Sequence, residues 1–527
     1  MTARFTWGYV AIVLTIGLAW MIATPPGIFS DSVSGFLVMR SMERGAPFNH
    51  TWVVDEDDIS VDRSEFTSWW TPGQYLVPMA IGSLGLDLGQ SMAVTIALAW
   101  LIGVAGFGSL WRRLGFTPEV TAISVAVLVS QSYVLSWGWY YHGGELLQWS
   151  FLPWFVLLGL RCREFKWLQV AAMAAALTLG IFFKSAFAII GASVIASLLL
   201  LEVGEWGRPF GVRTLSLALR SAVAAGVALA AFWGYVSLGD SPASNNPWSF
   251  SNIARGELLF AAAGPLNTLF ELWKSYIPAT EMMSLPGRGL GWPLLVVSLV
   301  SVLLLFAMAR FSGGSREYRV LVIGVYVCVV GAFSLAFALD LVISFNARHF
   351  RMAGVFFVPG IVALLTRIPS RSARFLSLGL VAALSLTITA QFAYPRPADP
   401  LARPVGTSGF SHSYASQAAL DALSSLDAQL GSGNNLVGVP WPQMGLDVRN
   451  SRVYNMRTAR RGAEFFRHRL FFGRVDNLIV MLPVQFAERD KISMVLRAFR
   501  EHGDWRRVRP EVEDYVFMYS GGLDDLR

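Results

Sequence analysis

A single carboxylate, Asp31, stands just beyond the first long apolar segment of this chain and opens an extended polar stretch. A carboxylate in that position can be shielded from bulk water, and a shielded carboxylate can act as a general base. An Asp directly ahead of a helical stretch is also a common helix N-cap, and the segment 32–40 has helical apolar spacing. The two interpretations are compatible, because a capping hydrogen bond uses one carboxylate oxygen and leaves the other able to accept a proton.

The segment 137–145 combines four aromatic residues with a histidine and a glutamate. In membrane proteins, aromatic residues gather at headgroup level without any further function, but this does not account for His142 and Glu145. These two polar side chains, separated by a glycine pair, could face a ring-shaped ligand that stacks on an aromatic residue. We therefore predict that His142, Glu145, Tyr141 and, from the preceding loop, Trp70 bind a sugar or its acceptor.

Three cations form a third group. Lys184, Arg348 and Arg351 each stand next to an apolar segment. Guanidinium groups bind phosphate bidentately, and at a membrane surface they are partly desolvated. Long basic side chains also extend toward the headgroups of ordinary phospholipid, so a specific lipid-phosphate site and general snorkelling are both open. Asp340, near the end of a neighbouring apolar segment, could neutralise one of the cations.

Asp55, Asp57 and Asp58 belong to the densest acidic run of the chain. A divalent cation accepts such carboxylate oxygens, which makes these residues candidates for a metal site. A solvated acidic face is the competing interpretation, because the run lacks the regular Asp-x-Asp-x-Asp-Gly spacing. A divalent metal is therefore a possible cofactor, and the sequence indicates no other.

The elements that position these residues are membrane helices. The chain has 527 residues, of which 54% are hydrophobic and only 15% charged, and its mean hydropathy is +0.50. Such a composition excludes an ordinary soluble domain and predicts an integral membrane protein whose apolar helices cross about 30 Å of hydrocarbon. We predict eleven spans, at 7–24, 88–110, 118–137, 145–160, 168–183, 187–204, 217–238, 291–309, 320–344, 352–366 and 375–392.

The distribution of basic residues predicts the orientation, because short loops rich in lysine and arginine stay in the cytoplasm. Alternate connections carry such residues, at 112–113, 161–166, 208–213, 310–319 and 367–374. We therefore expect a multi-pass protein of the cytoplasmic (inner) membrane, with its N-terminus inside, the Asp31 loop outside and the segment from 393 onward periplasmic or extracellular. Cytoplasmic arginine explains much of the formal charge of +7, so no nucleic-acid partner is needed. Lys184, Arg348 and Arg351 fall on the outer side.

Three outer segments, 25–87, 239–290 and 393–527, are too long to be simple connectors. In the first two, amphipathic stretches predict helices lying at the membrane surface, at 32–40, 75–86 and 256–273. The domain organisation we expect is a transmembrane module over 1–392 followed by a water-soluble domain.

The last segment begins with a proline-rich linker, and its apolar runs are then short enough for strands. We predict buried strands at 436–439 and 478–482, a helix at 491–501, and a closing hairpin formed by 505–508 with 515–519. The result is an α/β domain to which we assign no reaction of its own, because it carries no phosphate-binding glycine loop and no nucleophile elbow.

The order of these features resembles the GT-C class of integral-membrane glycosyltransferases, in particular the bacterial branch related to protein O-mannosyltransferases and the lipid A aminoarabinose transferase. Asp31 matches the position of the catalytic aspartate in the first outer loop, although Ser32 stands where that branch has an acidic neighbour. The motif Thr-Pro-Gly-Gln-Tyr at 71–75 is a looser counterpart of its Pro-Pro-Leu-like motif, and 351–359 approaches its Arg-Tyr-x-x-x-x-x-Pro pattern. The resemblance covers about residues 5 to 370.

What the resemblance implies is a GT-C-like polytopic helical fold and an inverting transfer of a sugar from a polyprenyl-phosphate donor. Asp31 would deprotonate the acceptor hydroxyl, while Arg348, Arg351 and Lys184 would hold the lipid phosphate. The acceptor could be a glycan, a lipid or a protein. A lipid or glycan flippase is the main alternative, but transporters usually show two related halves with a midplane site, and no such symmetry is visible here. A non-catalytic anchoring protein is a third possibility.

Overall fold

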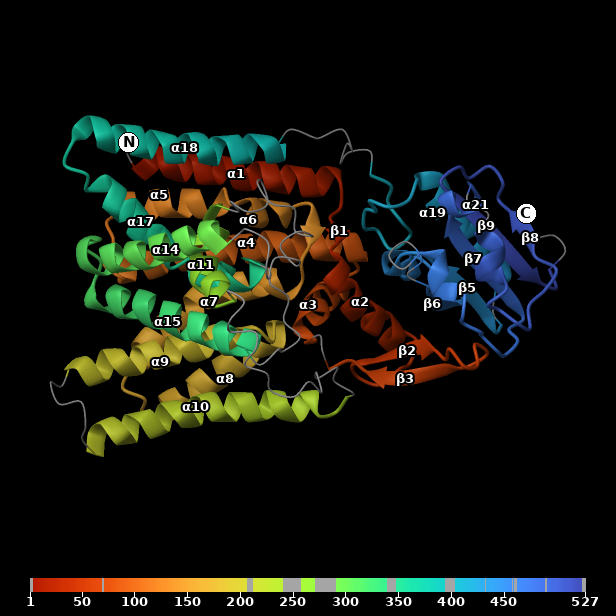
Figure 1. Ribbon diagram of the computed structural model, residues 1–527, viewed down its shortest axis with the longest axis horizontal. Helices are drawn as coiled ribbons and strands as arrows, with labels where there is room; N and C mark the ends of the chain where they lie inside the picture. Colours follow the sequence, from red (N-terminus) through yellow and green to blue (C-terminus); the bar gives the residue numbers. More distant parts are fainter. Residues whose placement is uncertain are drawn as a thin grey trace.

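The structure is a computed structural model that describes residues 3–68, 71–205, 212–239, 257–270, 291–338, 347–393, 403–431, 433–456, 458, 462–488 and 491–523. Its two parts follow one another along the long axis, a bundle of long helices and a smaller region built around a sheet (Figure 1). The N-terminus lies in the helical bundle and the C-terminus lies in the sheet region.

A helix overlaps each predicted span. The long helices of the bundle are α1 (Ala3–Ala23), α4 (Leu88–Arg113), α5 (Pro118–Val129), α7 (Gly144–Arg161), α8 (Trp167–Phe183), α9 (Phe187–Glu205), α10 (Val212–Val236), α14 (Gly291–Phe311), α15 (Arg316–Ala338), α17 (Phe357–Thr366) and α18 (Arg371–Ala393). Within the described residues, five helices are long and apolar enough to cross a membrane, or up to six if a pair bent by 51° at residues 348–366 counts as one span. These helices make the chain a multi-pass membrane protein, whereas the count of eleven spans stays a prediction.

Local sequence signals start several of these helices where the structure has them. The Asp87 side chain accepts a hydrogen bond from the backbone N–H of Gln90 at 2.7 Å, which caps α4. Thr117 caps α5 in the same way, and Pro118 occupies the first helical position, where its missing N–H costs nothing. Such caps make the ends of α4 and α5 predictable from the sequence alone.

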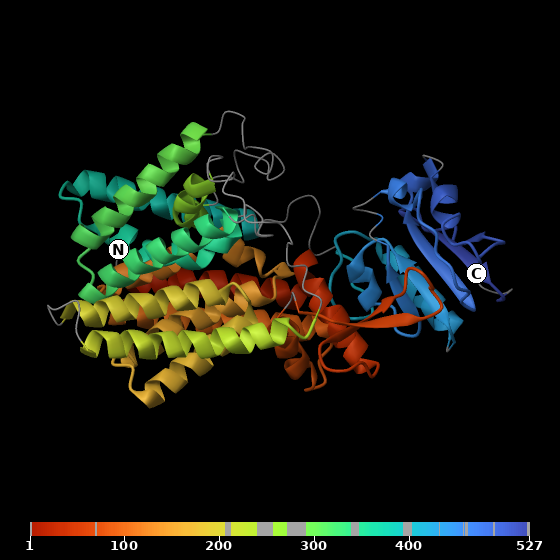
Figure 2. The same ribbon diagram turned by 60° about the horizontal axis from the view of Figure 1, so that its bottom comes forward.

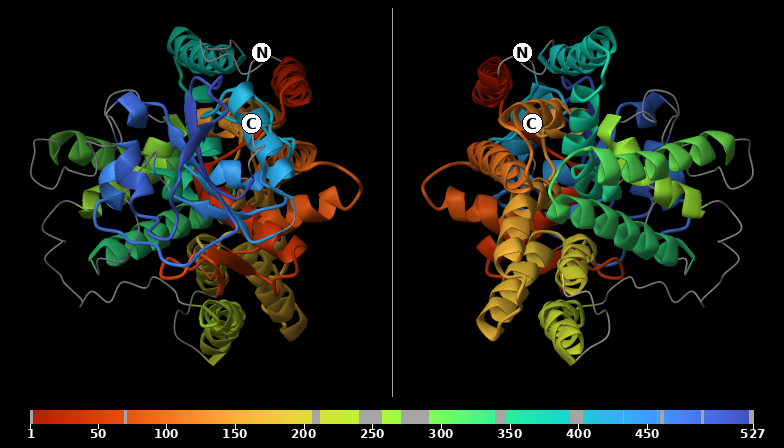
Figure 3. Two further views of the ribbon diagram at one scale, coloured as in Figure 1. Left: turned by 90° about the vertical axis from the view of Figure 1, so that its right-hand side faces the viewer. Right: turned by 90° about the vertical axis from the view of Figure 1, so that its left-hand side faces the viewer.

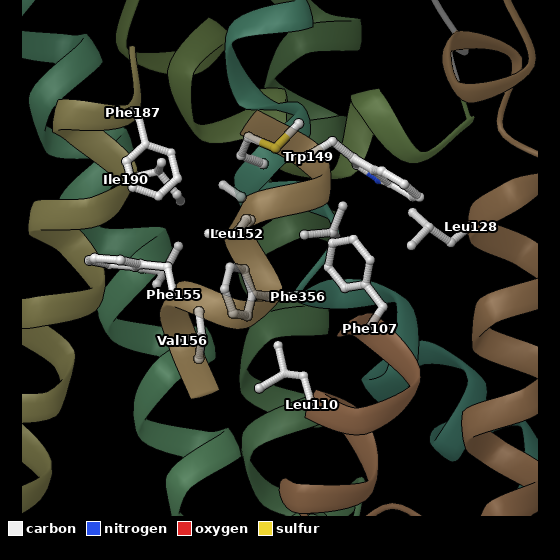
Figure 4. Packing of buried hydrophobic residues seen from close by; sticks show 14 of the residues in the cluster. Phe107, Leu110, Leu128, Trp149, Leu152, Phe155, Val156, Phe187, Ile190 and Phe356 are labelled. Carbon is white, nitrogen blue, oxygen red and sulfur yellow. The ribbon is translucent and has the colours of Figure 1, made fainter. Parts of the chain in front are cut away.

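Aromatic and aliphatic side chains from adjacent helices fill the centre of the bundle (Figure 4). Trp149 and Phe155 of α7 are almost completely buried, as is Phe107 of α4. Gly103 of α4 lets the two helices approach closely, because a Cβ atom at this position would overlap the Trp149 ring. The interlocked core fixes α7, which carries Glu145 in its first turn. Helices α10 and α18 stand at opposite edges of the bundle (Figure 3).

The first long loop contains strand β1 (Gly27–Ile28), helix α2 (Ser30–Glu43), the antiparallel hairpin of β2 (His50–Val54) and β3 (Asp62–Phe66), and helix α3 (Gly73–Gly82). The helix predicted at 32–40 is confirmed, and the helix predicted at 75–86 forms but ends at Gly82. Val33, Phe36 and Val38 of α2 are all completely buried, so the apolar face of this helix packs against the protein, and its position at the membrane surface stays a prediction.

In the second long loop, α11 (Glu257–Phe270) forms within the stretch predicted to be helical at 256–273. Residue 256 and residues 271–273 lie outside the described ranges.

The C-terminal region forms a five-stranded sheet in the order β6-β5-β7-β9-β8. Its elements are α19 (Gln417–Leu430), β5 (Asn435–Val439), β6 (Arg452–Asn455), β7 (Asn477–Pro483), α21 (Gln485–Glu488), α22 (Ile492–Leu496), β8 (Arg506–Val508) and β9 (Tyr515–Gly521). Strand β5 lies parallel to β6 and β7, whereas β9 pairs antiparallel with β7 and β8. The predicted strands and the closing hairpin are confirmed.

The prediction of a helix at 491–501 was wrong for the second half of that segment. Helix α22 ends at Leu496, because the backbone beyond it turns to pair with Phe471. The N–H of Phe471 donates to the carbonyl of Ala498 at 2.7 Å, and the N–H of Arg500 donates to the carbonyl of Phe471 at 3.1 Å. Stacking of the Phe471 and Phe499 rings, with centroids 5.0 Å apart, favours this bridge over further helix.

The β2–β3 hairpin reaches from the first loop onto the C-terminal sheet region (Figure 2). Its residues Val54 and Ile59 are buried in the same apolar cluster as Leu436 and Phe471. Arg452 of β6 completes the contact with an ion pair to Asp62 at 2.7 Å. The first long loop and the C-terminal region therefore share a hydrophobic core.

Candidate active site

Strand pairing brings the first loop next to the turn before α7. Strand β1 pairs in parallel with β4 (Tyr140–Tyr141), so that Gly27 lies opposite Tyr140 and Ile28 lies opposite Tyr141. The N–H of Phe29 extends the ladder by donating to the carbonyl of Tyr141 at 3.1 Å. Two chain segments far apart in the sequence therefore leave the pair in the same direction, and each enters a helix within a few residues. This arrangement places Asp31 and Glu145 at one site.

Asp31 lies in the first turn of α2, and the N-cap residue of that helix is Phe29, which makes no side-chain capping bond. The capping interpretation of Asp31 is therefore wrong. Its carboxylate instead accepts a hydrogen bond from the guanidinium of Arg348 and forms an ion pair with it. The Asp31 side chain is 32% exposed, so one part of the carboxylate faces its partner while another part is accessible.

Glu145 is the buried centre of the cationic side chains. With its side chain only 8% exposed, it pairs with Lys184 at 3.2 Å, with Arg351 at 3.0 Å and, more distantly, with Arg348 at 3.8 Å. Gly144 permits the approach of Lys184, because a Cβ atom there would overlap the carbonyl oxygen of Phe183. A buried carboxylate of this kind holds the cations in place.

Arg348 and Arg351 come from a short helical turn, η2 (Ala347–Phe350) followed by α16 (Arg351–Gly354). Phe350 anchors this turn in the core between α11 and α15, where its ring lies 4.7 Å from that of Phe333. Gly264 of α11 faces the same ring and has no Cβ atom that would overlap it. The two arginines are thus held by packing of their own backbone, as well as by the carboxylates.

The Arg351 guanidinium also lies 4.7 Å from the centroid of the Tyr133 ring, a cation–π contact that the sequence analysis missed. Tyr133 belongs to α6 (Ser132–Ser136), a short helix between α5 and β4. Nothing in its local sequence distinguishes it from the other aromatic residues of the bundle, so only the fold reveals this contact.

Five described ionic groups gather at this site. Lys184, Arg348 and Arg351 contribute positive charge, and Asp31 and Glu145 contribute negative charge. Guanidinium groups in a partly desolvated site are suited to bind a phosphate or carboxylate group. The structure thus brings together all three cations and two of the carboxylates that the sequence singled out.

The remaining predicted ligand-binding residues are placed differently. His142 stacks on Phe29, with ring centroids 4.4 Å apart, beside the carboxylates. Tyr141 is completely buried, and its hydroxyl donates to the carbonyl of Gln74 at 2.6 Å. Tyr141 therefore positions β4 and offers no open surface to a ligand. Trp70 and Asp340 lie outside the described residues.

The acidic run lies in the turn of the β2–β3 hairpin, beside the C-terminal sheet. Asp55 accepts a hydrogen bond from the backbone of Asp57 and pairs with Arg63 at 3.3 Å. Hydrogen bonds from Ser60 hold the pKa of Asp58 below its usual range. Within the described ranges, no three His, Cys, Asp or Glu side chains are grouped so that they could hold a metal ion. The contacts of the run are those of a structured turn.

Neither a protein-family model nor a curated protein matches the sequence. Among solved structures, the chain is similar to ArnT from Cupriavidus metallidurans in the apo state, with 12% identity, a TM-score of 0.51 and 98% of each chain covered. It is also similar to the arabinofuranosyltransferase AftD from Mycobacteria, with 15% identity and a TM-score of 0.48 over 100% of this chain and 40% of that one. The match to apo ArnT shows that the chain has a fold like that of this structure, as the sequence resemblance predicted.

Proposed function

We propose that the protein is an inverting glycosyltransferase that moves a sugar from a polyprenyl-phosphate donor to an acceptor hydroxyl at the outer face of the cytoplasmic membrane. The observation that carries this proposal is the cationic cluster beside Asp31. Three cations share two carboxylates, and one of those carboxylates remains partly exposed. The fold supports the same conclusion, because the similar solved structure of ArnT is that of a lipid A aminoarabinose transferase.

In the proposed reaction, the oxygen of the acceptor hydroxyl attacks the anomeric carbon of the sugar, and Asp31 accepts the proton that this hydroxyl loses. The bond between that carbon and the phosphate oxygen breaks, and the phosphate oxygen takes the electron pair. Arg348, Arg351 and Lys184 stabilise the charge on the departing lipid phosphate. General-base help typically contributes about 10²- to 10⁴-fold in rate, and stabilisation of the developing charge usually contributes more.

Because Asp31 and Arg348 form an ion pair, binding of the donor phosphate also affects the proposed base. An incoming phosphate competes for the Arg348 guanidinium, which weakens its hold on Asp31 and frees that carboxylate to contact the acceptor hydroxyl. Glu145 keeps Lys184 and Arg351 in position throughout, because it is buried between them. Donor binding would therefore activate the base.

The test uses the purified full-length protein in nanodiscs and a radiolabelled polyprenyl-phosphate sugar, with glycan analysis of a deletion strain to identify the missing product. We expect Asp31→Asn to lower transfer at least a hundred-fold while leaving donor binding largely intact, because the amide cannot accept a proton but keeps the same shape. Asp421→Asn, an exposed carboxylate on α19, is the matched control and should transfer at the wild-type rate. Full activity of Asp31→Asn would remove Asp31 from the mechanism.

The flippase alternative predicts a different result in the assay with purified protein. A flippase would change the distribution of a lipid-linked sugar across the membrane, but it would form no glycosidic bond. Transfer by the purified wild-type protein would exclude this alternative. The location of the ionic cluster, where the loop strands β1 and β4 enter their helices, supports the transferase.

A further inference from the structure

A cluster of aromatic side chains lies where the segment 403–416 meets strand β4. The ring of Tyr414 stacks on that of Trp441, with centroids 4.1 Å apart and planes inclined by 16°. The hydroxyl of Tyr140 lies 3.1 Å from that of Ser413. The guanidinium of Arg403 lies 4.7 Å from the centroid of the Tyr140 ring. We call Tyr140, Tyr414 and Trp441 the aromatic platform.

The aromatic platform is open to solvent and bordered by polar groups. Tyr414 is 47% exposed, although Trp441 covers one face of its ring. Ser413 is exposed as well, and Arg403 is partly exposed. Tyr140 and Arg403 lie near enough to Tyr414 to influence the pKa of its hydroxyl, which burial raises. Flat apolar ring faces therefore occur next to hydroxyl and guanidinium donors, a combination typical of ligand sites.

The segment that carries Tyr414 is anchored on both parts of the molecule. His412 pairs with Asp447 at 2.7 Å, and both side chains are buried. The backbone of Ser408 donates to the same carboxylate at 2.9 Å. On the other side, Ser411 forms a parallel bridge with Gly27 of β1. The aromatic platform is therefore formed before any ligand arrives, which lowers the entropy cost of binding.

The aromatic platform is also close to the candidate active site along the chain. Tyr140 and Tyr141 point to opposite sides of β4, as neighbouring strand residues do. Tyr141 is buried, whereas Tyr140 faces the segment 403–416. Glu145 follows Tyr140 after five residues, and at about 3.3 Å per extended residue the two lie at most about 16 Å apart along the chain. A short oligosaccharide spans such a distance.

We propose that the aromatic platform binds the acceptor and that the acceptor is a carbohydrate chain, one end of which reaches Asp31. This inference rests on the proposed function. A sugar ring has an apolar face of C–H groups that packs on an aromatic ring, and its hydroxyl groups hydrogen-bond at the rim. Tyr414 and Trp441 would supply the stacking face, and Arg403, Ser413 and the Tyr140 hydroxyl would bind sugar hydroxyls.

The first experiment measures binding without any donor. Full-length protein in nanodiscs is mixed with short oligosaccharides of arabinose, mannose, galactose or glucose, and with a serine- and threonine-rich peptide. Saturation-transfer NMR then reports which probe is bound. We expect at least one oligosaccharide to bind, and Tyr414→Leu to weaken its binding about five- to ten-fold through loss of the flat ring. Tyr414→Phe, which keeps the ring, should bind like the wild type.

Two further variants separate this inference from the proposed function. Phe472→Ala removes an aromatic residue of similar exposure, 48%, from the β2–β3 side of the C-terminal region and should leave binding unchanged. Asp31→Asn should also keep binding, because it changes the reaction and not the aromatic platform. If Asp31→Asn retains transfer while Tyr414→Leu loses binding, the proposed base is wrong and the aromatic platform stands.

Other outcomes would overturn the inference. Absence of binding to every oligosaccharide, or equal binding by Tyr414→Leu and wild type, would remove the aromatic platform as a carbohydrate site. Tyr414-dependent binding of the peptide alone would point to a protein acceptor instead. In the transfer assay, a carbohydrate acceptor bound at this site predicts that Tyr414→Leu raises KM for the acceptor about five- to ten-fold with little change in kcat.

Discussion

Arg348 contacts both carboxylates of the candidate active site, Asp31 through a direct ion pair and Glu145 at 3.8 Å. This geometry gives the two acidic residues different tasks. Glu145 is buried and contacts three cations, so it orders the cluster. Asp31 is partly exposed and contacts only Arg348 among these cations, so it can be released from that ion pair. A lone carboxylate in the sequence could not be assigned to either task, because the assignment depends on how many cations surround it.

Replacement of Glu145 tests its ordering task. Glu145→Gln removes the negative charge from a buried position and leaves Lys184 and Arg351 beside a neutral amide. Breaking a buried ion pair in this way typically costs about 3–5 kcal/mol, so we expect a lower unfolding temperature and weaker donor binding. Thermal unfolding in detergent measures the first effect, with Glu65→Gln on the exposed part of β3 as control. An unchanged unfolding temperature would contradict this account.

His502 gives the C-terminal region a predictable response to pH. Burial, and then the nearby Arg474, lower the pKa of its imidazole in the folded protein below the ordinary value of 6.5. The imidazole also accepts a hydrogen bond from the backbone of Val475 at 3.4 Å, which requires an unprotonated nitrogen.

Because the unfolded chain takes up this proton first, the free energy of unfolding should fall as the pH drops from above 6.5 toward the folded pKa. Chemical denaturation followed between pH 8 and pH 5 should show this loss in the wild type and a smaller one in His502→Gln. Equal slopes for the two proteins would rule out the histidine as its source.

At the scale of elements, close approach of α4 and α7 holds the Glu145 end of α7 in place. Gly103→Ala should destabilise the protein by about 1–3 kcal/mol, because the added Cβ overlaps the buried ring of Trp149, which has no room to move. Gly226→Ala in α10 is the matched control. A Cβ there meets nothing within 4 Å, and alanine favours a helix by up to about 1 kcal/mol. Thermal unfolding of both variants measures the difference, and similar unfolding temperatures would contradict the packing argument.

Helix α2 links the candidate active site to the C-terminal region. Its first turn carries Asp31, and near its other end Arg40 and Arg44 donate to the backbone carbonyl of Val448. A rigid helix held at both ends fixes the position of its first turn, so the C-terminal region helps to position the proposed base. This role does not require the C-terminal region to perform any reaction.

At the scale of the whole molecule, the two parts depend on one another, because Val54 and Ile59 of the first loop are buried in the C-terminal core. The Asp62–Arg452 ion pair at the edge of this contact offers a test by charge exchange. Asp62→Arg and Arg452→Asp each place like charges together, and each should loosen the hairpin and lower transfer several-fold. The double variant should recover part of the loss, since it restores opposite charges. The rate at which a protease cleaves residues 50–66 measures the loosening of the hairpin. If the double variant is cleaved as fast as either single variant, the two charges are not coupled.

Much of the architecture was predictable from local patterns. Apolar runs located every long helix, capping residues marked the start of α4 and α5, and short apolar runs located β5, β7 and the β8–β9 hairpin. The hairpin β2–β3 was missed, because its alternation is weak and its apolar residues are buried only against the C-terminal sheet. The burial of the apolar face of α2 inside the protein was not predicted either, since the helix packs against residues distant in the sequence.

The sequence by itself determined which side chains could do chemistry, because residue type sets whether a group can bind phosphate or accept a proton. It also determined the membrane helices, since hydropathy is a local property. Only the tertiary structure decided that Asp31 is not a cap and that Glu145 joins three cations. The parallel pairing of β1 with β4 and the anchoring of Phe350 bring these groups within ionic distance. Contacts between residues so distant along the chain depend on the packing of the whole bundle, which no local pattern contains.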